Sequence, residues 1–247
     1  LPDSTPAKLF VYHMNLRSDD CGMNLANVED KSGRPLNYQM RKTMMRIDLE
    51  EPLEPNNKFE FKMSWWYNLN NRMEDYGRSG YEYFPEDENY LYTIAQFYPR
   101  VAVYDDYEGW QQKQFVGGGE FALTFGDFDV KITVPEDHVV GATGDKPVWI
   151  VTETEARVKE TQRSNRYVTW HYKASNVRDS AFASSRKFIW DAQSVTLGGK
   201  KIMAMSLYPK EGNPLWEKES TKAIINTLKT YSKYTIDYPY PTAISVH

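Results

Sequence analysis

FEFKMSWWY, residues 59–67, is the stretch that decides the fold class, because large apolar side chains alternate along it with mostly polar ones. In an extended chain the following side chains share one face: Phe59, Phe61, Met63, Trp65 and Tyr67. Strict alternation of this kind predicts a β-strand with one buried and one exposed face.

Further short strands are expected along most of the chain. Residues 128–134 and 168–172 repeat the alternating pattern. The other strand candidates are 44–49, 91–97, 100–104, 120–125, 148–153, 186–190 and 201–208. Residues 74–90, which are rich in acidic residues and tyrosines, read as a long acidic loop. Many short strands without helices between them favour a mostly β protein, an antiparallel β-sandwich.

One helix is expected after these strands, over residues 214–234. Pro214 suits a first helical turn, and apolar residues recur near helical spacing. The apolar positions are Trp216, Ala223, Ile224, Leu228 and Tyr231. The prolines of Tyr238–Pro241 prevent the helix from continuing. Because one helix cannot bury its apolar stripe alone, we expect residues 1–199 to form the sandwich domain and residues 200–247 to begin a second domain.

The composition limits the possible functions. The chain has 247 residues, of which 40% are hydrophobic and 15% aromatic, which is ample material for a packed core. A net charge of −4 with interspersed charges disfavours nucleic acid as a partner, and no apolar run reaches transmembrane length. The only cysteine, Cys21, excludes an internal disulfide and a cysteine-based zinc finger.

No metal ligand and no catalytic residue are expected within this chain. Its histidines are far apart in sequence, and none is followed by glutamate as in the HExxH zinc motif: His13, His138, His171 and His247. No GxSxG elbow surrounds a serine. The carboxylate pair Asp105-Asp106 could bind a cation, but adjacent residues at a strand end usually point apart, so turn formation is the preferred interpretation.

Four blocks of sequence follow one another in an order that resembles the aminopeptidase N family of zinc metallopeptidases (peptidase family M1). The first is TIAQFYPRVAVYDD, residues 93–106, and the second is GEFALTFGDFDVKITVP, residues 119–135. The third is VRDSAFASSRKFIWD, residues 177–191, and the fourth is YSKYTIDYPYP, residues 231–241. The fourth block is similar to the Tyr-Pro turn that opens a thermolysin-like catalytic domain in the family's bacterial members.

The resemblance implies that this chain is the N-terminal part of a zinc-dependent aminopeptidase that removes N-terminal residues from peptides. In the family the GxMEN and HExxH motifs come after the Tyr-Pro turn, and this sequence contains neither. Zinc would therefore be bound by the parent protein and not by this chain, which alone would be inactive. The sandwich, expected to lack its first strands, would wall the active-site cleft and pack against the rest of its own catalytic domain. A periplasmic, cell-surface or secreted bacterial location is expected.

One family role can be carried to a residue of this chain. In the family a Gln or Glu from the sandwich domain helps to hold the free α-amino group of the substrate, and Gln96 is the matching residue. An amide oxygen can accept hydrogen bonds from an ammonium group. The departures are a short spacing between Gln96 and Arg100, and Tyr107 where the family has proline. The alternative for Gln96 is a strand-end residue bonded to neighbouring backbone.

Two other functions remain open. The chain could be a non-catalytic β-sandwich binding module for a carbohydrate or protein ligand, using Trp65, Trp66, Trp110 and the tyrosines of residues 76–92. That alternative requires an aromatic platform open to solvent, and it fails if the helix packs on the strands and the aromatics are buried. The other possibility is a structural or chaperone-like domain derived from the same family without catalysis.

Overall fold

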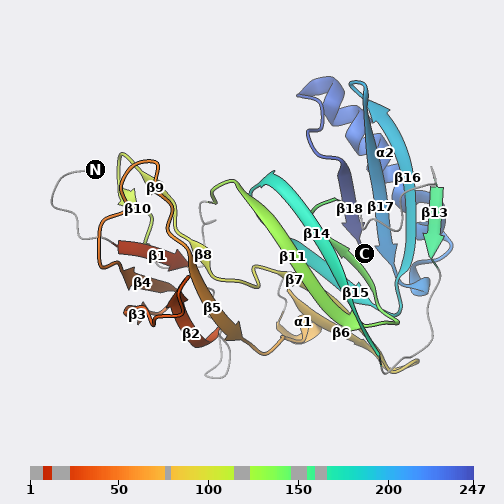
Figure 1. The fold of residues 1–247 in the computed structure, drawn as a ribbon. Coiled ribbons are helices and arrows are strands. Elements are labelled where there is room, and N and C mark those ends of the chain that lie inside the picture. The colour runs from red at the N-terminus through yellow and green to blue at the C-terminus, as the bar shows by residue number, and fades with distance from the viewer. Residues whose placement is uncertain (1–7, 13–22, 76–78, 114–122, 146–154, 159–165) are drawn as a thin grey trace. The chain divides into compact units, whose positions relative to one another are not determined.

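The structure is a computed structural model that describes residues 8–12, 23–75, 79–113, 123–145, 155–158 and 166–247 (Figure 1). The chain divides into two compact units, one made of residues 1–69 and 96–124 and the other of residues 70–95 and 125–247. Short antiparallel strands dominate the described residues, which contain two α-helices. The predicted mostly β class is therefore confirmed.

Two small sheets and a short hairpin make up the described part of the first unit. Its strands are β1 (Lys8–Tyr12), β2 (Asn24–Asp30), β3 (Tyr38–Arg41), β4 (Met44–Asp48), β5 (Phe61–Trp66), β8 (Arg100–Val101), β9 (Tyr104–Asp105) and β10 (Gly109–Trp110). The sheets have the orders β3-β4-β1-β8, β2-β5 and β10-β9. Val28, Met45 and Ile47 are buried, and Phe61 and Met63 of β5 pack against them. The alternation seen in residues 59–67 thus places one face of β5 on a core, as predicted.

In its described residues the second unit contains three sheets and both α-helices. Its elements are α1 (Arg72–Asp75), β6 (Gly80–Phe84), β7 (Asn89–Ala95), β11 (Gly126–Pro135), β12 (Val139–Ala142), β13 (Glu155–Val158), β14 (Tyr167–Val177), β15 (Ala181–Ser185), β16 (Ile189–Leu197), β17 (Lys200–Tyr208), the short 3-10 turn η2 (Lys210–Gly212), α2 (Leu215–Tyr234) and β18 (Thr242–Val246). The sheet orders are β11-β14, β12-β15-β7-β6 and β13-β16-β17-β18. The β17-β18 pair is parallel, and the others are antiparallel.

Strand β12 contacts the two other sheets of this unit. The Tyr172 hydroxyl of β14 donates a hydrogen bond of 2.6 Å to the Val140 carbonyl. The next residue, Gly141, lies so close to β17 that a Cβ atom there would be 2.7 Å from Leu207 Cδ1. Because Leu207 is fully buried, β12 is held between β14 and β17 by close packing.

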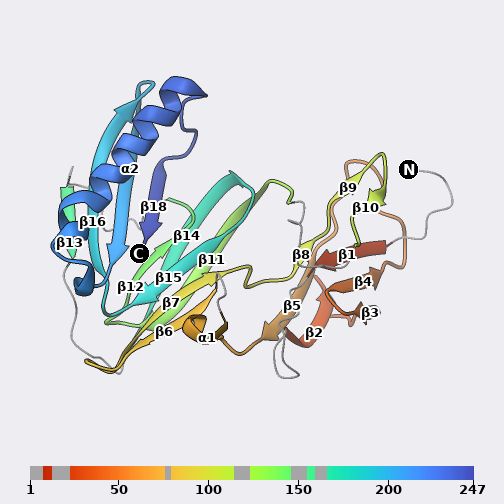
Figure 2. The same ribbon diagram turned by 180° about the vertical axis from the view of Figure 1, so that it is seen from behind.

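Helix α2 packs on β16 and β17, as Figure 2 shows from behind. Its buried apolar residues Ile225 and Leu228 share a cluster with Val195, Ile202 and Ala204 of the two strands. The predicted helix is therefore confirmed within one residue at its start, and the strands that precede it cover its apolar face. No helix among the described residues has the length and apolar character needed to span a membrane.

The predicted apolar stripe of this helix is only partly right. Tyr231 is 66% exposed, whereas Thr221, which was not expected to face inward, is buried. The Thr221 hydroxyl donates to the Asp191 carboxylate at 2.7 Å and lies 2.7 Å from the Ser206 hydroxyl. These bonds satisfy a polar side chain at a position that periodicity alone would give to an apolar one.

Residues 74–90 were expected to be a loop, and the structure contradicts this prediction. They contain the end of α1, all of β6 and the start of β7, which pair as a hairpin with Tyr81 opposite Tyr92 and Tyr83 opposite Tyr90. Cross-strand aromatic pairs stabilise such a hairpin, and the many acidic residues obscured the alternation in the sequence.

The expected strand over 186–190 is only partly right, because residues 189–190 begin β16 whereas Arg186–Phe188 form the turn between β15 and β16. The reason is visible at Lys187, which is 1% exposed. Its ammonium group contacts the Asp87 carboxylate, lies 2.7 Å from Glu211 and sits over the Phe84 ring at 4.6 Å. A buried ammonium group needs partners of opposite charge, and the turn places Lys187 where it contacts them.

The structure also tests the other predicted strands. The strands expected at 44–49, 91–97, 128–134, 168–172 and 201–208 are found, with bounds shifted by a few residues. Of 100–104, only Arg100–Val101 and Tyr104 lie in strands, and residues 123–125 are not a strand. Residues 120–122 and 148–153 lie outside the described residues. The domain boundary at residue 199, which falls in the turn between β16 and β17, stays a prediction.

Candidate functional site

Gln96, the residue matched to substrate binding, directly follows the last residue of β7. Its φ angle is 54°, in the left-handed region that residues with a Cβ atom rarely adopt. The side chain is half-buried, and within the part of the chain that the structure describes its amide has no hydrogen-bond partner. The substrate-binding role of Gln96 and the alternative of a structural strand-end glutamine both stay predictions.

The backbone after Gln96 is fixed from another part of the first unit. The indole N–H of Trp65, on β5, donates a hydrogen bond of 2.8 Å to the Phe97 carbonyl. The Phe97 ring then packs edge-on against Tyr98, with 5.0 Å between the ring centroids. These contacts hold the residues that follow Gln96 in one arrangement, which is the requirement for keeping a disfavoured backbone conformation.

Arg100 anchors the end of this segment. Its guanidinium lies 5.7 Å from the centroid of the Tyr98 ring, and its Nη2 donates to the Thr124 carbonyl at 3.2 Å. Arg100 is also the first residue of β8, which pairs with β1. A cation over an aromatic ring is attracted by the ring face, so the aromatic segment after Gln96 is held at both ends.

Asp105 acts as a turn former, as predicted. Its carboxylate accepts hydrogen bonds from the backbone N–H of Glu108 at 2.7 Å and of Tyr107 at 3.0 Å, and from the Gln111 amide at 2.5 Å. These donors, the Glu108 N–H first among them, lower the pKa of Asp105. The carboxylate closes the hairpin of β9 and β10 and is already occupied by protein donors.

His138 is a buried neutral histidine. It is 7% exposed, and its Nδ1 lies 2.9 Å from the hydroxyl of Ser184, which is 2% exposed. The pKa of His138 is lowered to about 4, chiefly by burial and then by the positive charge of Arg186, while the Asp137 carboxylate opposes the change. A serine and histidine this deeply buried offer no access to a substrate, so the pair is structural.

The described histidines do not assemble into a metal site. His171 lies on the exposed face of β14 with its Nε2 2.5 Å from Asp129, and the His247 ring packs against Trp216. His13 lies outside the described residues. Among the residues that the structure describes, no three His, Cys, Asp or Glu side chains are grouped closely enough to hold a metal ion. The described side chains therefore do not fit a zinc site.

The aromatic residues considered for a ligand platform are divided between the two units. Trp65 and Trp66 point to opposite faces of β5, and Trp66 is 58% exposed. Trp110 packs edge-on against Tyr104 in the short hairpin of the same unit.

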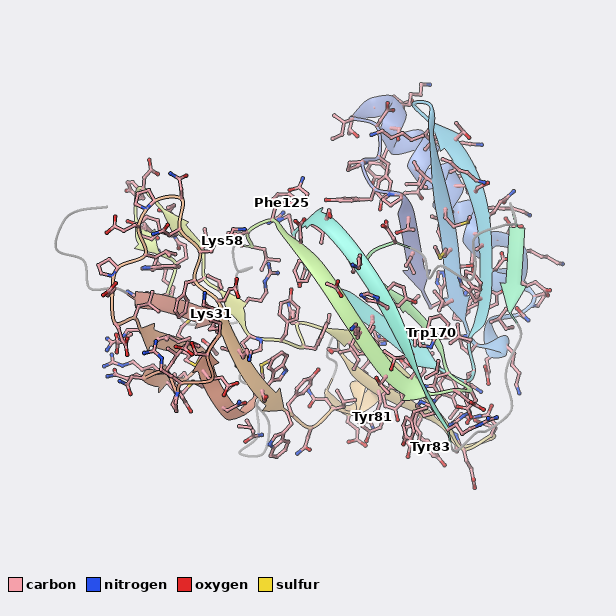
Figure 3. All side chains as sticks on the ribbon, in the orientation of Figure 1. Lys31, Lys58, Tyr81, Tyr83, Phe125 and Trp170 are labelled. Carbon is pink, nitrogen blue, oxygen red and sulfur yellow. The ribbon has the colours of Figure 1, made fainter. Side chains whose placement is uncertain are left out.

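The tyrosines of the β6–β7 hairpin belong to the second unit, where Figure 3 labels Tyr81 and Tyr83. Tyr90 is surrounded by the other three, with ring centroids 5.6 Å from Tyr81, 4.8 Å from Tyr83 and 6.0 Å from Tyr92. The rings thus pack on one another, although Tyr83 is 44% exposed and Tyr90 39% exposed. A binding module would be excluded if the helix packs on the strands and the aromatic residues are buried. The helix does pack on the strands, but the aromatic residues are only partly buried, so the binding module is not excluded.

Comparison with known proteins finds a similar fold in solved structures. No protein-family model matches the sequence, and no curated protein matches it significantly. The structure is similar to the M1 zinc metallopeptidase of Deinococcus radiodurans, with a TM-score of 0.56, 13% identity, and coverage of 98% of this chain and 49% of that chain. A mutant of that metallopeptidase bound to a Tyr-Ser-Ala substrate has the same TM-score, 0.56, and the same identity, 13%.

A second similar structure is aminopeptidase A of Legionella pneumophila in complex with aspartic acid. The TM-score is 0.55 at 12% identity, over 99% of this chain and 25% of that chain. The chain thus spans about half the length of the Deinococcus protein and a quarter of the Legionella protein. At these identities the similarity shows a shared fold, that of part of M1 metallopeptidases.

Proposed function

We propose that this chain is the N-terminal part of a zinc-dependent aminopeptidase, a β-sandwich with the first elements of a thermolysin-like catalytic domain. The observation that carries the proposal is that nearly the whole chain, 98% of it, matches the fold of one metallopeptidase while covering 49% of that protein. The four sequence blocks that resemble the family support it, because they are properties of the sequence and do not depend on the fold. Export to a bacterial periplasm or surface is part of the same proposal.

In this proposal the chain's own residues bind and orient the peptide and perform no bond cleavage. The sandwich walls the cleft and packs against the rest of its own catalytic domain, and zinc held by residues after His247 supplies the hydrolytic chemistry. Gln96 accepts hydrogen bonds from the α-ammonium group of the peptide. Its disfavoured backbone angle of 54° supports this role, since strained residues cluster at ligand sites, and among the described residues its amide has no hydrogen-bond partner.

Activity assays on a short and a long form of the protein test the proposal. The 247-residue chain is expected to show no hydrolysis of L-alanine p-nitroanilide, whereas the protein continued past His247 hydrolyses it and loses the activity on zinc chelation. Zinc-dependent hydrolysis by the short chain, or none by the long form, would overturn the proposal.

The role of Gln96 has a separate test in the long form. Gln96→Ala is expected to raise KM for the free-amine substrate about tenfold, because one hydrogen bond to a charged group is lost. Gln39→Ala, which removes an exposed glutamine from β3 of the same unit, is the control and should leave KM unchanged. An unchanged KM for Gln96→Ala would refute the role.

A further inference from the structure

Trp65 and Trp66 are neighbours on β5 with different surroundings. Trp65 is half-buried, and its indole N–H donates to the Phe97 carbonyl at 2.8 Å, across 32 residues of sequence. Trp66 faces the other side of the strand and is 58% exposed. The indole N–H of a partly buried tryptophan usually donates to a hydrogen-bond acceptor. Here that acceptor is the backbone carbonyl of the residue directly after Gln96.

The position of that acceptor matters because of the backbone at Gln96. A φ of 54° brings the Cβ atom of an L-residue close to the carbonyl oxygen that follows, so the chain leaves this conformation unless its surroundings hold it. The hydrogen bond from Trp65 fixes the carbonyl of the next residue and so restricts the torsions that join it to Gln96. Glycine or asparagine would hold this angle at lower cost, and glutamine has no such advantage.

We infer that Trp65 is a positioning residue for Gln96. It holds the left-handed backbone at Gln96, whose amide has no hydrogen-bond partner among the residues described and would bind the ligand. Trp65 acts through the Phe97 carbonyl and does not touch the ligand. The inference rests on the proposed function, in which that ligand is the α-ammonium group of a peptide. It adds a residue from β5 that neither the four sequence blocks nor the family resemblance includes.

Kinetics of the protein continued past His247 provide the first test. Trp65→Phe removes the donor and keeps a ring, and it should raise KM for L-alanine p-nitroanilide about threefold to tenfold with kcat unchanged, as loss of one hydrogen bond implies. Trp66→Phe is the matched control and should leave KM as it is. Combined with Gln96→Ala, the Trp65 change should add no further rise, because the two residues act through one contact.

A second replacement separates the hydrogen bond from folding. Substituting 3-benzothienylalanine at position 65 replaces the N–H by sulfur and preserves the shape of the ring system. It should reproduce the rise in KM caused by Trp65→Phe. In NMR spectra of the 247-residue chain it should also shift the Gln96 Cα and Cβ resonances, which report the left-handed angle, whereas Trp66→Phe should not.

The possible outcomes distinguish failure of the positioning role of Trp65 from failure of the proposed function. If Gln96→Ala raises KM but removal of the Trp65 donor changes neither KM nor the Gln96 resonances, the positioning role is wrong and the proposed function stands. A rise in KM that is equally large in the Gln96→Ala background also refutes the positioning role. If Gln96→Ala itself leaves KM unchanged, the binding role fails, and the positioning role fails with it.

Discussion

Acidification should destabilise the second unit through one side chain, His138. Burial keeps this histidine neutral and lowers its pKa from 6.5 to about 4. In the unfolded chain it would take up a proton near pH 6.5, so between about pH 6.5 and 4 the unfolded state binds one more proton than the folded state. Stability contributed by His138 is therefore complete above about pH 6.5, falls as the pH drops, and levels off below about pH 4.

The size of the effect follows from the two pKa values. A shift from 6.5 to about 4 corresponds to about 3 kcal/mol at the low-pH limit, at 1.36 kcal/mol per pH unit. At pH 5 about 2 kcal/mol of this is lost, because the unfolded state is mostly protonated there and the folded state is not. The 7% exposure of His138 means that solvent screens little of this energy.

Urea unfolding between pH 7.5 and 4.5, followed by circular dichroism, measures the effect. His138→Asn keeps a polar atom near the Nδ1 position and removes the titration, so the difference in unfolding free energy between wild type and variant should narrow by about 2 kcal/mol from pH 7.5 to pH 5. The control is His171→Asn, which removes an exposed histidine of β14. Its free energy of unfolding should fall with pH nearly as much as that of the wild type. A His138 variant with the wild-type pH dependence would refute the reasoning, as would a His138 imidazole that titrates near pH 6.5 by NMR.

Three further substitutions test the packing of the second unit. Gly144→Ala should cost at least about 3 kcal/mol in urea unfolding, because φ is 126° and the new Cβ would lie 2.5 Å from a carbonyl oxygen of β14, whereas Gly126→Ala, with open space around it, should cost little. Lys187→Met leaves two carboxylates without their buried cation and should lower stability by about 2 kcal/mol; an unchanged melting temperature would show that the ion cluster contributes nothing. Ile225→Ala should lower the free energy of unfolding of α2 by about 2–4 kcal/mol, which would be measured as faster amide hydrogen exchange in the helix. The control is Lys229→Ala, at an exposed position of the same helix. Exchange in Ile225→Ala that is no faster than in this control would contradict the packing of α2 on its strands.

Local periodicity explains which elements could be predicted from the sequence. Strand β5 and helix α2 follow from alternation and from helical spacing, which are properties of a few consecutive residues. Strand β6 was missed because Glu82 and the acidic turn after it hide the Tyr81–Tyr83 alternation. Its stability comes from pairing with β7, which the local pattern does not contain.

The candidate site shows the same limit. Gln96 could be proposed from its place in a sequence block, but its backbone angle of 54° has no sequence signal, since glutamine does not favour that region. The hydrogen bond that links Trp65 to Phe97 joins residues 32 positions apart and depends on how the strands of the first unit come together. A tryptophan on a half-buried strand indicates that its indole N–H needs a hydrogen-bond acceptor, but the sequence does not show which residue provides it.

Buried charge marks a further boundary of sequence reasoning. Lys187 lies in a stretch that reads as a strand, and only the carboxylates of Asp87 and Glu211, 100 and 24 residues away in sequence, explain why it forms a buried turn. Such a position depends on distant partners, because a lysine is buried only when its charge is paired.

The nucleotide sequence that follows the His247 codon tests the central claim most directly. If this chain is the N-terminal part of a zinc aminopeptidase, the reading frame continues and encodes a GxMEN motif and then an HExxH motif. A stop codon at that point, or an open frame that contains neither motif, would contradict the claim that these strands serve a zinc-dependent peptidase.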